Sequence, residues 1–314
     1  MLNIDDSFFR EENRWNETIS EAMKRAWAIQ LEVLYEVLSI AQKHDIPIWM
    51  EYGSLLGTVR HHGYIPWDDD IDLCLFREDY MKFLFILQKE LPRERVVRSF
   101  YTQKNYEQPK AFVNTRAVID IGIDTREMEF TKKMWGCPYS GGVDLFPLDY
   151  IPKDEAYWKQ LIELYKIVYD LGIGFEKYQS SGELEGFVRQ IESTLNVTIE
   201  RGDGMLDSVW KVADSLSMMT TRDEAGFVTW YPEYAMCGAR RKRPVDAYSK
   251  TVWMDYEMLK VPVPIGYDEV LRTEYGDNYM TPVKGTAGHD YPYYKIQEKK
   301  ILFNNRIGQI GDIF

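Results

Sequence analysis

The chain has 314 residues, 45% of them hydrophobic and 28% charged, which is enough for one large domain or two smaller ones around a buried core. Lys and Arg number 38 against 50 Asp and Glu, and a net charge of −12 excludes broad nucleic-acid binding, which needs a basic surface. The three cysteines stand far apart and the four histidines accompany no C-x-x-C pair, so a disulfide framework and a structural zinc site are not expected.

The N-terminal segment, MLNIDDSFFREENRW, is acidic and lacks the apolar stretch of a signal peptide. No uncharged run approaches the ~18 residues that cross a bilayer, so we expect a cytoplasmic protein. Apolar residues then recur at three- and four-residue spacing across 14–44 and predict a helix, which ends at His44-Asp45-Ile46-Pro47.

The segment from 46 to 150 has the pattern of an α/β core. Ile48–Tyr52 predicts a short strand that stops at Gly53, and Ser54 is the predicted N-cap of a short helix that reaches His62. The other elements predicted in this segment are strands at 70–76, 96–102 and 110–121, a helix at 78–90, and a turn followed by a strand at 141–147.

Beyond residue 150 the pattern turns mostly helical. The stretch 153–222 predicts helices, two of them within 183–222, and the tail from 225 mixes short strands, proline-rich loops and helices near 267–275 and 291–303. We therefore predict an α/β (α+β) fold with a mixed sheet. Residues 1–150 would hold the N-terminal helix and the core, and residues 151–314 a mostly helical region packed on it.

The stretch IPWDDDIDL places four carboxylates in five positions beside apolar residues. Side chains alternate along a strand, so a strand that starts early enough points Asp68, Asp70 and Asp72 to one face. Carboxylates packed together raise one another's pKa values, and a divalent cation such as Mg²⁺ or Mn²⁺ removes the conflict. We predict a metal site here. The alternative is an acidic turn before an ordinary strand, whereas an EF-hand is excluded because Leu73 stands where that loop needs glycine.

The upstream stretch GSLLGTVR follows a predicted strand and opens a predicted helix. A helix N-terminus presents unpaired N–H groups and the positive end of the helix dipole, so Gly53 and Ser54 are predicted to cradle a phosphate. Arg60, farther along the helix, is a candidate contact for a second phosphate. A phosphate cradle beside a metal site is what phosphoryl or nucleotidyl transfer requires.

Two-metal chemistry needs one more carboxylate on a neighbouring strand, and Asp144 in GGVDLFPLD is the best candidate. Asp144 would either bind metal or accept a proton from the attacking hydroxyl. A turn-capping or exposed residue is the alternative interpretation, and Asp149 is the fallback carboxylate.

These motifs resemble the LicD family, which includes bacterial lipopolysaccharide and teichoic-acid cholinephosphotransferases and is related to the fukutin-related glycan phosphotransferases. The stretches EYGSLLGTVRHHGYIPWDDDIDL, GGVDLFPLDYIP and VPVPIGYDEVLRTEYGDNYMTP resemble its blocks in order, so the likeness covers most of the chain. The resemblance implies a nucleotidyltransferase-like catalytic core. It implies transfer of a substituted phosphate, such as phosphocholine, from a CDP-linked donor to a sugar hydroxyl of a cell-surface glycan, with CMP released and Mg²⁺ required.

The resemblance also assigns roles to single residues. Asp70 and Asp72 would be the core metal ligands, with Asp68 and Asp144 beside them. The segment PKAFVNTR departs from the family pattern, so the basic residue that contacts the donor stays open among Lys110, Arg116 and Arg60. His289 is a candidate acceptor contact, with an exposed loop position as the alternative. If the donor carries choline, its ammonium would want an aromatic cage, with candidate walls at Trp67, Trp135, Tyr139 and Tyr231. Core packing is the alternative interpretation of each of these aromatic residues.

Two other functions stay open from the sequence. The protein could transfer a nucleotide from an NTP to a small hydroxyl substrate. Alternatively, it could be a binding protein that needs a divalent ion and catalyses no reaction. The carried group is not fixed among choline, ethanolamine, aminoethylphosphonate, ribitol and glycerol. A lipid-linked acceptor would place the protein at the inner face of the membrane. The basic run Arg240–Arg243 is interpreted as a solvated loop, with an anionic ligand as the alternative.

Overall fold

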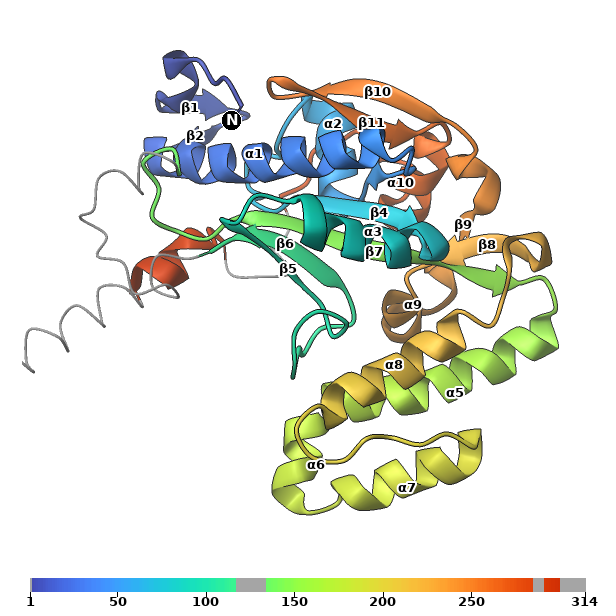
Figure 1. Cartoon of the computed structure of the whole chain (residues 1–314). Helices are drawn as coiled ribbons and strands as arrows, with labels where there is room; N and C mark the ends of the chain where they lie inside the picture. The colour runs from blue at the N-terminus through green and yellow to red at the C-terminus, as the bar shows by residue number, and fades with distance from the viewer. Residues whose placement is uncertain (1, 117–133, 285–290, 300–314) are drawn as a thin grey trace, which may run out of the picture.

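The computed structural model describes residues 2–116, 134–284 and 291–299, and its centre is a curled mixed sheet (Figure 1). Strands β4 and β7 run parallel in the middle of the sheet, and their other neighbours are antiparallel. Along the main path the order is β3 (Trp49–Met50), β4 (Asp72–Phe76), β7 (Gly142–Pro152), β6 (Ala111–Thr115) and β5 (Arg95–Arg98). Two further strands extend the far end of β7, namely β8 (Ala225–Thr229) and β9 (Arg243–Pro244).

One face of this sheet is covered by α1 (Glu21–Lys43), with α3 (Arg77–Glu90) packed beside it. A Cβ built at Gly141 would meet Ile29 and Gln30 of α1, so residues at odd positions of β7 face that helix. Helix α1 begins where Ser20 accepts a hydrogen bond from the N–H of Met23 (3.3 Å). The even positions, which include Asp72 and Asp144, point to the opposite face.

Helix α2 (Tyr52–His61) and α9 (Tyr231–Cys237) lie on that opposite face, where Tyr52 and Trp230 pack edge-on against Phe146. The remaining elements are two hairpins, α10 and short 3-10 segments. Their bounds are β1 (Glu12–Arg14), β2 (Glu17–Ile19), β10 (Thr251–Tyr256), β11 (Leu259–Pro264), α10 (Tyr267–Tyr275), η1 (Asp6–Phe9), η2 (Arg222–Glu224), η3 (Gly238–Arg241) and η4 (Val245–Tyr248).

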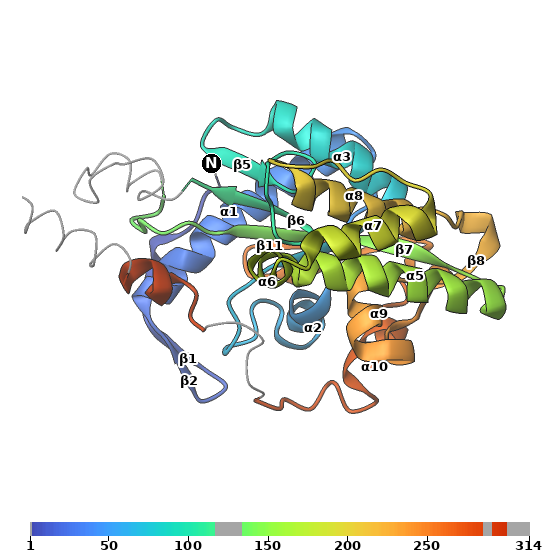
Figure 2. The same ribbon diagram turned by 90° about the horizontal axis from the view of Figure 1, so that it is seen from below.

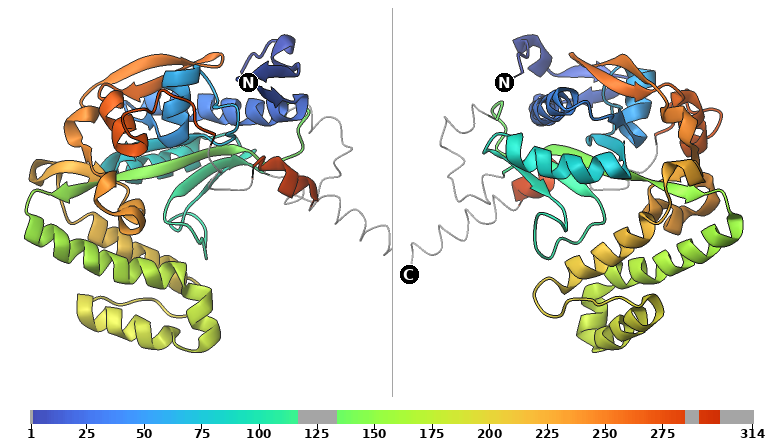
Figure 3. Two further views of the ribbon diagram at one scale, coloured as in Figure 1. Left: turned by 180° about the vertical axis from the view of Figure 1, so that it is seen from behind. Right: turned by 45° about the vertical axis from the view of Figure 1, so that its right-hand side comes forward.

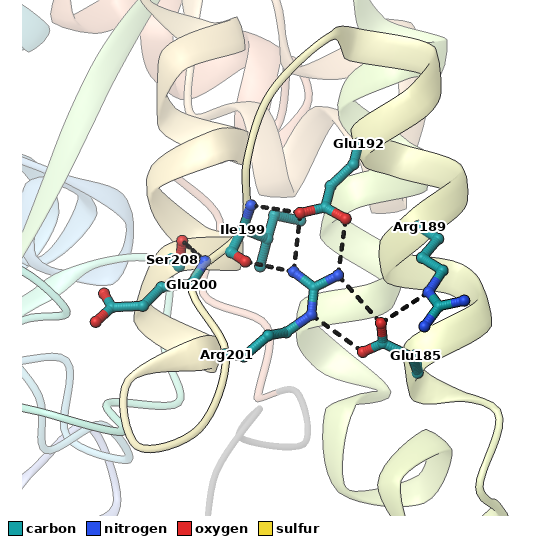
Figure 4. Close-up of polar contacts among 7 residues, drawn as sticks. All are labelled: Glu185, Arg189, Glu192, Ile199, Glu200, Arg201 and Ser208. Carbon is teal, nitrogen blue, oxygen red and sulfur yellow. Dashed lines mark hydrogen bonds and ion pairs between the residues drawn. The ribbon is translucent and has the colours of Figure 1, made fainter.

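A separate helical layer lies below the sheet in Figure 1 and is seen from beneath in Figure 2. It comprises α5 (Glu155–Ile173), α6 (Phe175–Ser181), α7 (Leu184–Leu195) and α8 (Met205–Ser217). The layer has its own hydrophobic cluster, centred on Trp158, Tyr165 and Trp210. At its outer edge Arg201 binds Glu192 and Glu185 (Figure 4), an exposed ion-pair group that contributes little to stability.

The predicted α/β class and mixed sheet are confirmed. The helical stretch predicted at 153–222 ends at Ser217, and the remainder of the C-terminal half alternates the strands β8 to β11 with α9 and α10. The larger hydrophobic cluster draws its residues from 19–150 and from 225–294. In both views of Figure 3 the elements of these two parts of the chain lie against each other. The domain boundary expected at residue 150 stays a prediction. Within the described residues, no helix is both long enough and apolar enough to span a bilayer.

Several predicted boundaries shift. Helix α1 starts at Glu21 and not near residue 14, because residues 12–19 form the hairpin β1–β2. The predicted strand at 110–121 ends at Thr115, and its last residues lie outside the described part of the chain. The helix predicted at 267–275 matches α10, and of the one predicted at 291–303 the structure describes a helical segment at 294–299.

Candidate active site

The start of α2 is joined to the start of β4 through the main chain of Asp72. The N–H of Glu51 donates to the carbonyl of Asp72 (2.9 Å), and the N–H of Asp72 donates to Ser54 Oγ (2.9 Å). Ser54 is therefore not the N-cap, as predicted, but lies in the first turn of a helix that begins at Tyr52 after Glu51. Ser54 is buried where the helix packs against the strand, and its hydroxyl joins the two through the bond to Asp72.

Gly53 lies directly against Asp68. A Cβ built at Gly53 would overlap Asp68 Oδ2, so only glycine lets this carboxylate approach the first turn of α2. The preceding residue, Tyr52, has a φ of 45°, in the left-handed region that most side chains avoid. The predicted phosphate cradle is thus a tightly packed helix start, with an acidic side chain beside it.

Asp72 and Asp144 are nearest neighbours across the parallel strands β4 and β7. Because directly opposite residues share a face, the two carboxylates stand side by side on the face away from α1. Burial, followed by the charges of Asp70 and Asp144, raises the pKa of Asp72 well above its ordinary value. The strand-to-strand pairing predicted for Asp144 is present.

Asp68 and Asp70 are not strand residues, because β4 begins only at Asp72. The alternation argument that grouped them with Asp72 is therefore wrong, although the grouping itself holds. Burial, followed by the charge of Asp70, raises the pKa of Asp68 well above its ordinary value, and Asp68 in turn acts on Asp72. The turn before the strand brings these side chains together.

Asp69 separates from its neighbours and points into the protein. Its Oδ2 accepts a hydrogen bond from the N–H of Tyr293 (2.6 Å), and its carbonyl accepts one from Gln30 Nε2 (2.7 Å). Asp69 is fully buried. This anchor fixes the turn from both α1 and the C-terminal segment, while the charges of Asp68 and Asp70 act on Asp72.

Lys110 is the candidate cation that reaches the carboxylates. Its Nζ donates to Asp144 Oδ2 at 2.6 Å and lies 4.6 Å from the ring centroid of Phe146. Phe112 pairs directly with Asp144 across β6 and β7, so Lys110 reaches it diagonally from the same face. Burial lowers the pKa of Lys110, but the charges of Asp144 and Asp72 outweigh this effect and raise it.

The other predicted contacts lie elsewhere. Arg60 is in the last turn of α2, where its Nη1 donates to the carbonyl of Tyr279 (2.7 Å). Arg116 is exposed at the opposite end of β6, with Nε 3.4 Å from the carbonyl oxygen of Arg93. The structure does not bring Arg60 or Arg116 to the carboxylates. His289 lies outside the described residues.

The four aromatic residues considered for a cage each pack against a different neighbour. Tyr231 is fully buried, and its hydroxyl donates to the carbonyl of Tyr150 (2.7 Å), so it cannot line a ligand pocket. The remaining contacts are Trp67 with His61, Trp135 with Phe9, and Tyr139 with Tyr294. Core packing accounts for Tyr231, as the alternative interpretation held.

Residues that the sequence interpretation missed also face the site. Arg98 pairs with Phe112, which pairs with Asp144, so Arg98 lies in the same cross-strand row as the carboxylates. Burial and the charge of Asp144 raise the pKa of Tyr106, while Arg98 opposes the shift, so that hydroxyl lies near enough to feel both charges. Alternation within the predicted strand at 96–102 was the signal that could have identified Arg98.

The basic run is not the solvated loop that the sequence suggested. Arg243 is completely buried and binds Glu51 at 2.7 Å, and Arg241 pairs with Glu233 at 3.4 Å. The anions that these arginines meet are the protein's own glutamates, which stand far from them in the sequence.

The carboxylate cluster fits a divalent cation in its donor chemistry. Hard carboxylate oxygens are what Mg²⁺ and Mn²⁺ prefer. Burial, followed by the charges of neighbouring carboxylates, raises the pKa of both Asp68 and Asp72. As the side chains stand, no three His, Cys, Asp or Glu residues in the described ranges converge closely enough to hold a metal ion. Binding one therefore requires side-chain rotation, including at Asp144, which Lys110 now neutralises.

Part of the chain matches a known protein family. The model of the LicD/FKTN/FKRP family, nucleotidyltransferase domain, matches residues 45–152, which contain α2, β4, β6 and most of the candidate site. The chain is 23% identical to the lipopolysaccharide cholinephosphotransferase LicD of Haemophilus influenzae over 87% of this chain and 95% of that protein.

Two other relatives match only in part. An uncharacterised protein of Rickettsia typhi is 38% identical over 22% of this chain and 25% of its own length. The human ribitol 5-phosphate transferase FKRP is 44% identical over 14% of this chain and 9% of its own length. Residues 45–152 therefore carry a domain of the LicD/FKTN/FKRP type, and the resemblance that the sequence motifs indicated is confirmed for this part of the chain.

Proposed function

We propose that the protein is a Mg²⁺- or Mn²⁺-dependent phosphotransferase that moves a substituted phosphate, such as phosphocholine, from a CDP-linked donor to a sugar hydroxyl of a glycan and releases CMP. One observation carries the proposal. The first turn of α2 is hydrogen-bonded to Asp72, whose side chain stands beside Asp144. A helix start suited to phosphate thus adjoins a carboxylate cluster suited to a divalent cation.

The relatives support a transfer reaction. The one that aligns over most of this chain is named as a cholinephosphotransferase of lipopolysaccharide, and the partial match FKRP as a ribitol 5-phosphate transferase. Both names describe the movement of a phosphate that bears a small polyol or amino alcohol. A lipid-linked acceptor would bring this protein to the inner face of the membrane.

Each group at the site has a part in the proposed reaction. The metal would be held by Asp68, Asp70, Asp72 and Asp144, and it would neutralise charge on the donor phosphates. The N–H groups at the start of α2 would bind the diphosphate and orient it for in-line attack. Once Asp144 turns to the cation, Lys110 would be released to contact the donor phosphate.

A donor panel tests the proposal. Purified protein is incubated with a glycan acceptor, Mg²⁺ and, in turn, CDP-choline, CDP-ethanolamine, CDP-ribitol and CDP-glycerol, and CMP release is measured against an EDTA control. We expect Mg²⁺-dependent CMP release with one donor above the others. Absence of CMP with every donor would contradict the proposal.

A second candidate function is nucleotide transfer, because the matched domain is described as a nucleotidyltransferase domain. The same assay with CTP, UTP or ATP in place of the CDP donor separates the two. Release of pyrophosphate with the nucleotide retained on the acceptor favours nucleotidyl transfer. Ligand binding without any turnover would indicate a binding protein.

A further inference from the structure

We propose that Arg243, which lies outside the matched domain, is a positioning residue that fixes the start of α2 and the main chain of Asp72. Only the activity measurement that tests this inference rests on the proposed function; the structural measurement does not. Arg243 belongs to β9, and its side chain is completely buried behind the helix start. It touches none of the candidate metal ligands and would act on them through Glu51.

Arg243 gathers three carboxylates from three separate segments. Its Nη1 lies 2.7 Å from Glu51 Oε1, and its Nη2 lies 3.3 Å from Glu233 and 3.4 Å from Glu274. Glu51 is the N-cap position of α2, whereas Glu233 and Glu274 belong to α9 and α10. A single guanidinium therefore ties the start of α2 to two helices from the C-terminal half.

The same cluster restrains Tyr52, the first residue of α2. Its hydroxyl donates to Glu233 Oε2 (2.7 Å), and the Arg243 guanidinium lies 5.1 Å from its ring centroid. Tyr52 has a φ of 45°, a left-handed conformation that persists only where the surroundings enforce it. Arg241 completes the cluster by pairing with Glu233 and Glu274.

Glu51 connects this cluster to the candidate site. Its side chain is on Arg243, while its N–H donates to the carbonyl of Asp72. The main-chain N–H of Asp72 in turn donates to Ser54 Oγ, so both main-chain polar groups of Asp72 are bonded to the start of α2. If Arg243 loses its Nη1 contact with Glu51, Glu51 keeps a buried charge with poorer pairing, and the helix start can shift relative to Asp72.

A second buried arginine provides a matched control. Arg77 donates through Nε and Nη2 to Asp149 (2.6 and 3.1 Å) and through Nη1 to Asp214 (2.8 Å). It resembles Arg243 in burial and partners, but it follows the opposite end of β4 from Asp72. Asp149, which the sequence offered as the alternative to Asp144, therefore accepts hydrogen bonds from Arg77.

The test compares Arg243→Lys with Arg77→Lys in the full chain. Hydrogen–deuterium exchange of peptides covering 50–56 and 71–74 reports the position of the helix start without requiring activity. We expect Arg243→Lys to speed exchange there by at least about tenfold, and Arg77→Lys to leave it unchanged at similar thermal stability. With a working donor, kcat should fall by about 10- to 100-fold in Arg243→Lys and by less than about twofold in Arg77→Lys.

Equal exchange in the two variants would overturn the inference, because Arg243 would then contribute only general stability. If the wild type releases no CMP, the proposed function fails while the exchange measurement still decides the role of Arg243. Should Arg243→Lys not fold, Tyr52→Phe removes only the hydroxyl bond to Glu233. Unchanged exchange at 50–56 in that variant would likewise count against the cluster as a positioning device.

Discussion

At the scale of single residues, Asp72 shows a conflict between function and stability. Burial and the neighbouring charges of Asp70 and Asp144 raise its pKa well above the ordinary value. A carboxyl group with a raised folded-state pKa supports stability at low pH, and that support is lost as the pH rises through the folded pKa. The ionised form that would bind a cation is thus the form that destabilises the metal-free protein.

Asp72→Asn should therefore abolish activity while it stabilises the metal-free fold. We expect CMP release to fall more than about 100-fold, beyond the 10- to 100-fold usual for a residue that only supports a metal ligand. At pH 7.5 in EDTA, the Tm of the variant should be above that of the wild type, and added Mg²⁺ should raise the Tm of the wild type alone. A lower Tm for the variant in EDTA would contradict the charge repulsion.

Gly53 gives a second prediction at this scale, because a side chain there would meet Asp68. Gly53→Ala should lower the free energy of unfolding by about 1–3 kcal/mol, as overpacking does. When Asp68 is also replaced by Ala, most of that loss of stability should disappear. Urea unfolding of the wild type, the two single variants and the double variant measures the difference. Gly186→Ala, where a built Cβ meets nothing within 4 Å, is the control and should stabilise by about 0.4–1 kcal/mol.

At the scale of elements, the helix starts were the hardest feature to predict. Ser54 looked like an N-cap because Gly-Ser before an apolar run is a common helix start. The true N-cap position is Glu51, whose role depends on Arg243. Local spacing sufficed for α10 and α3, where amphipathic periodicity carries the signal. It could not place α2, which is held by contacts that span nearly 200 residues of sequence.

The cluster behind α2 carries more negative than positive charge. Glu51, Glu233 and Glu274 face Arg241 and Arg243, so one carboxylate lacks a full counter-charge. Burial raises the pKa of Glu233 to about 7, although Arg243 opposes the shift. Because its folded pKa is raised, the stability that Glu233 supports at low pH is lost as the pH rises from about 4.5 through about 7.

Glu233→Gln should remove this pH dependence. Relative to the wild type, the variant should gain more stability at pH 8 than at pH 5, because the amide can still accept the hydroxyl bond of Tyr52. Urea unfolding at the two pH values measures the difference. A gain that is the same at both values would mean that Glu233 does not titrate in this range.

At the scale of the whole molecule, the C-terminal half completes the site. The family match ends at residue 152, yet Tyr293 holds Asp69, and Arg243, which Glu274 also contacts, binds Glu51. The sequence indicated the sheet core, because strand periodicity is a local signal, and it indicated Asp144 as a carboxylate on a neighbouring strand, because two-metal chemistry needs one there. It could not indicate these long-range contacts, since a buried arginine and a solvated one look alike in a basic run.

The most direct measurement is a crystal structure of the protein soaked with Mn²⁺ and CDP, the portion shared by all candidate donors. We predict an anomalous peak within about 2.0–2.2 Å of oxygens of Asp70 and Asp72, a diphosphate at the first turn of α2, and Lys110 moved from Asp144 toward phosphate. Ordered CDP elsewhere, with Lys110 still on Asp144 and no ion between Asp70 and Asp72, would contradict the proposed phosphotransfer site.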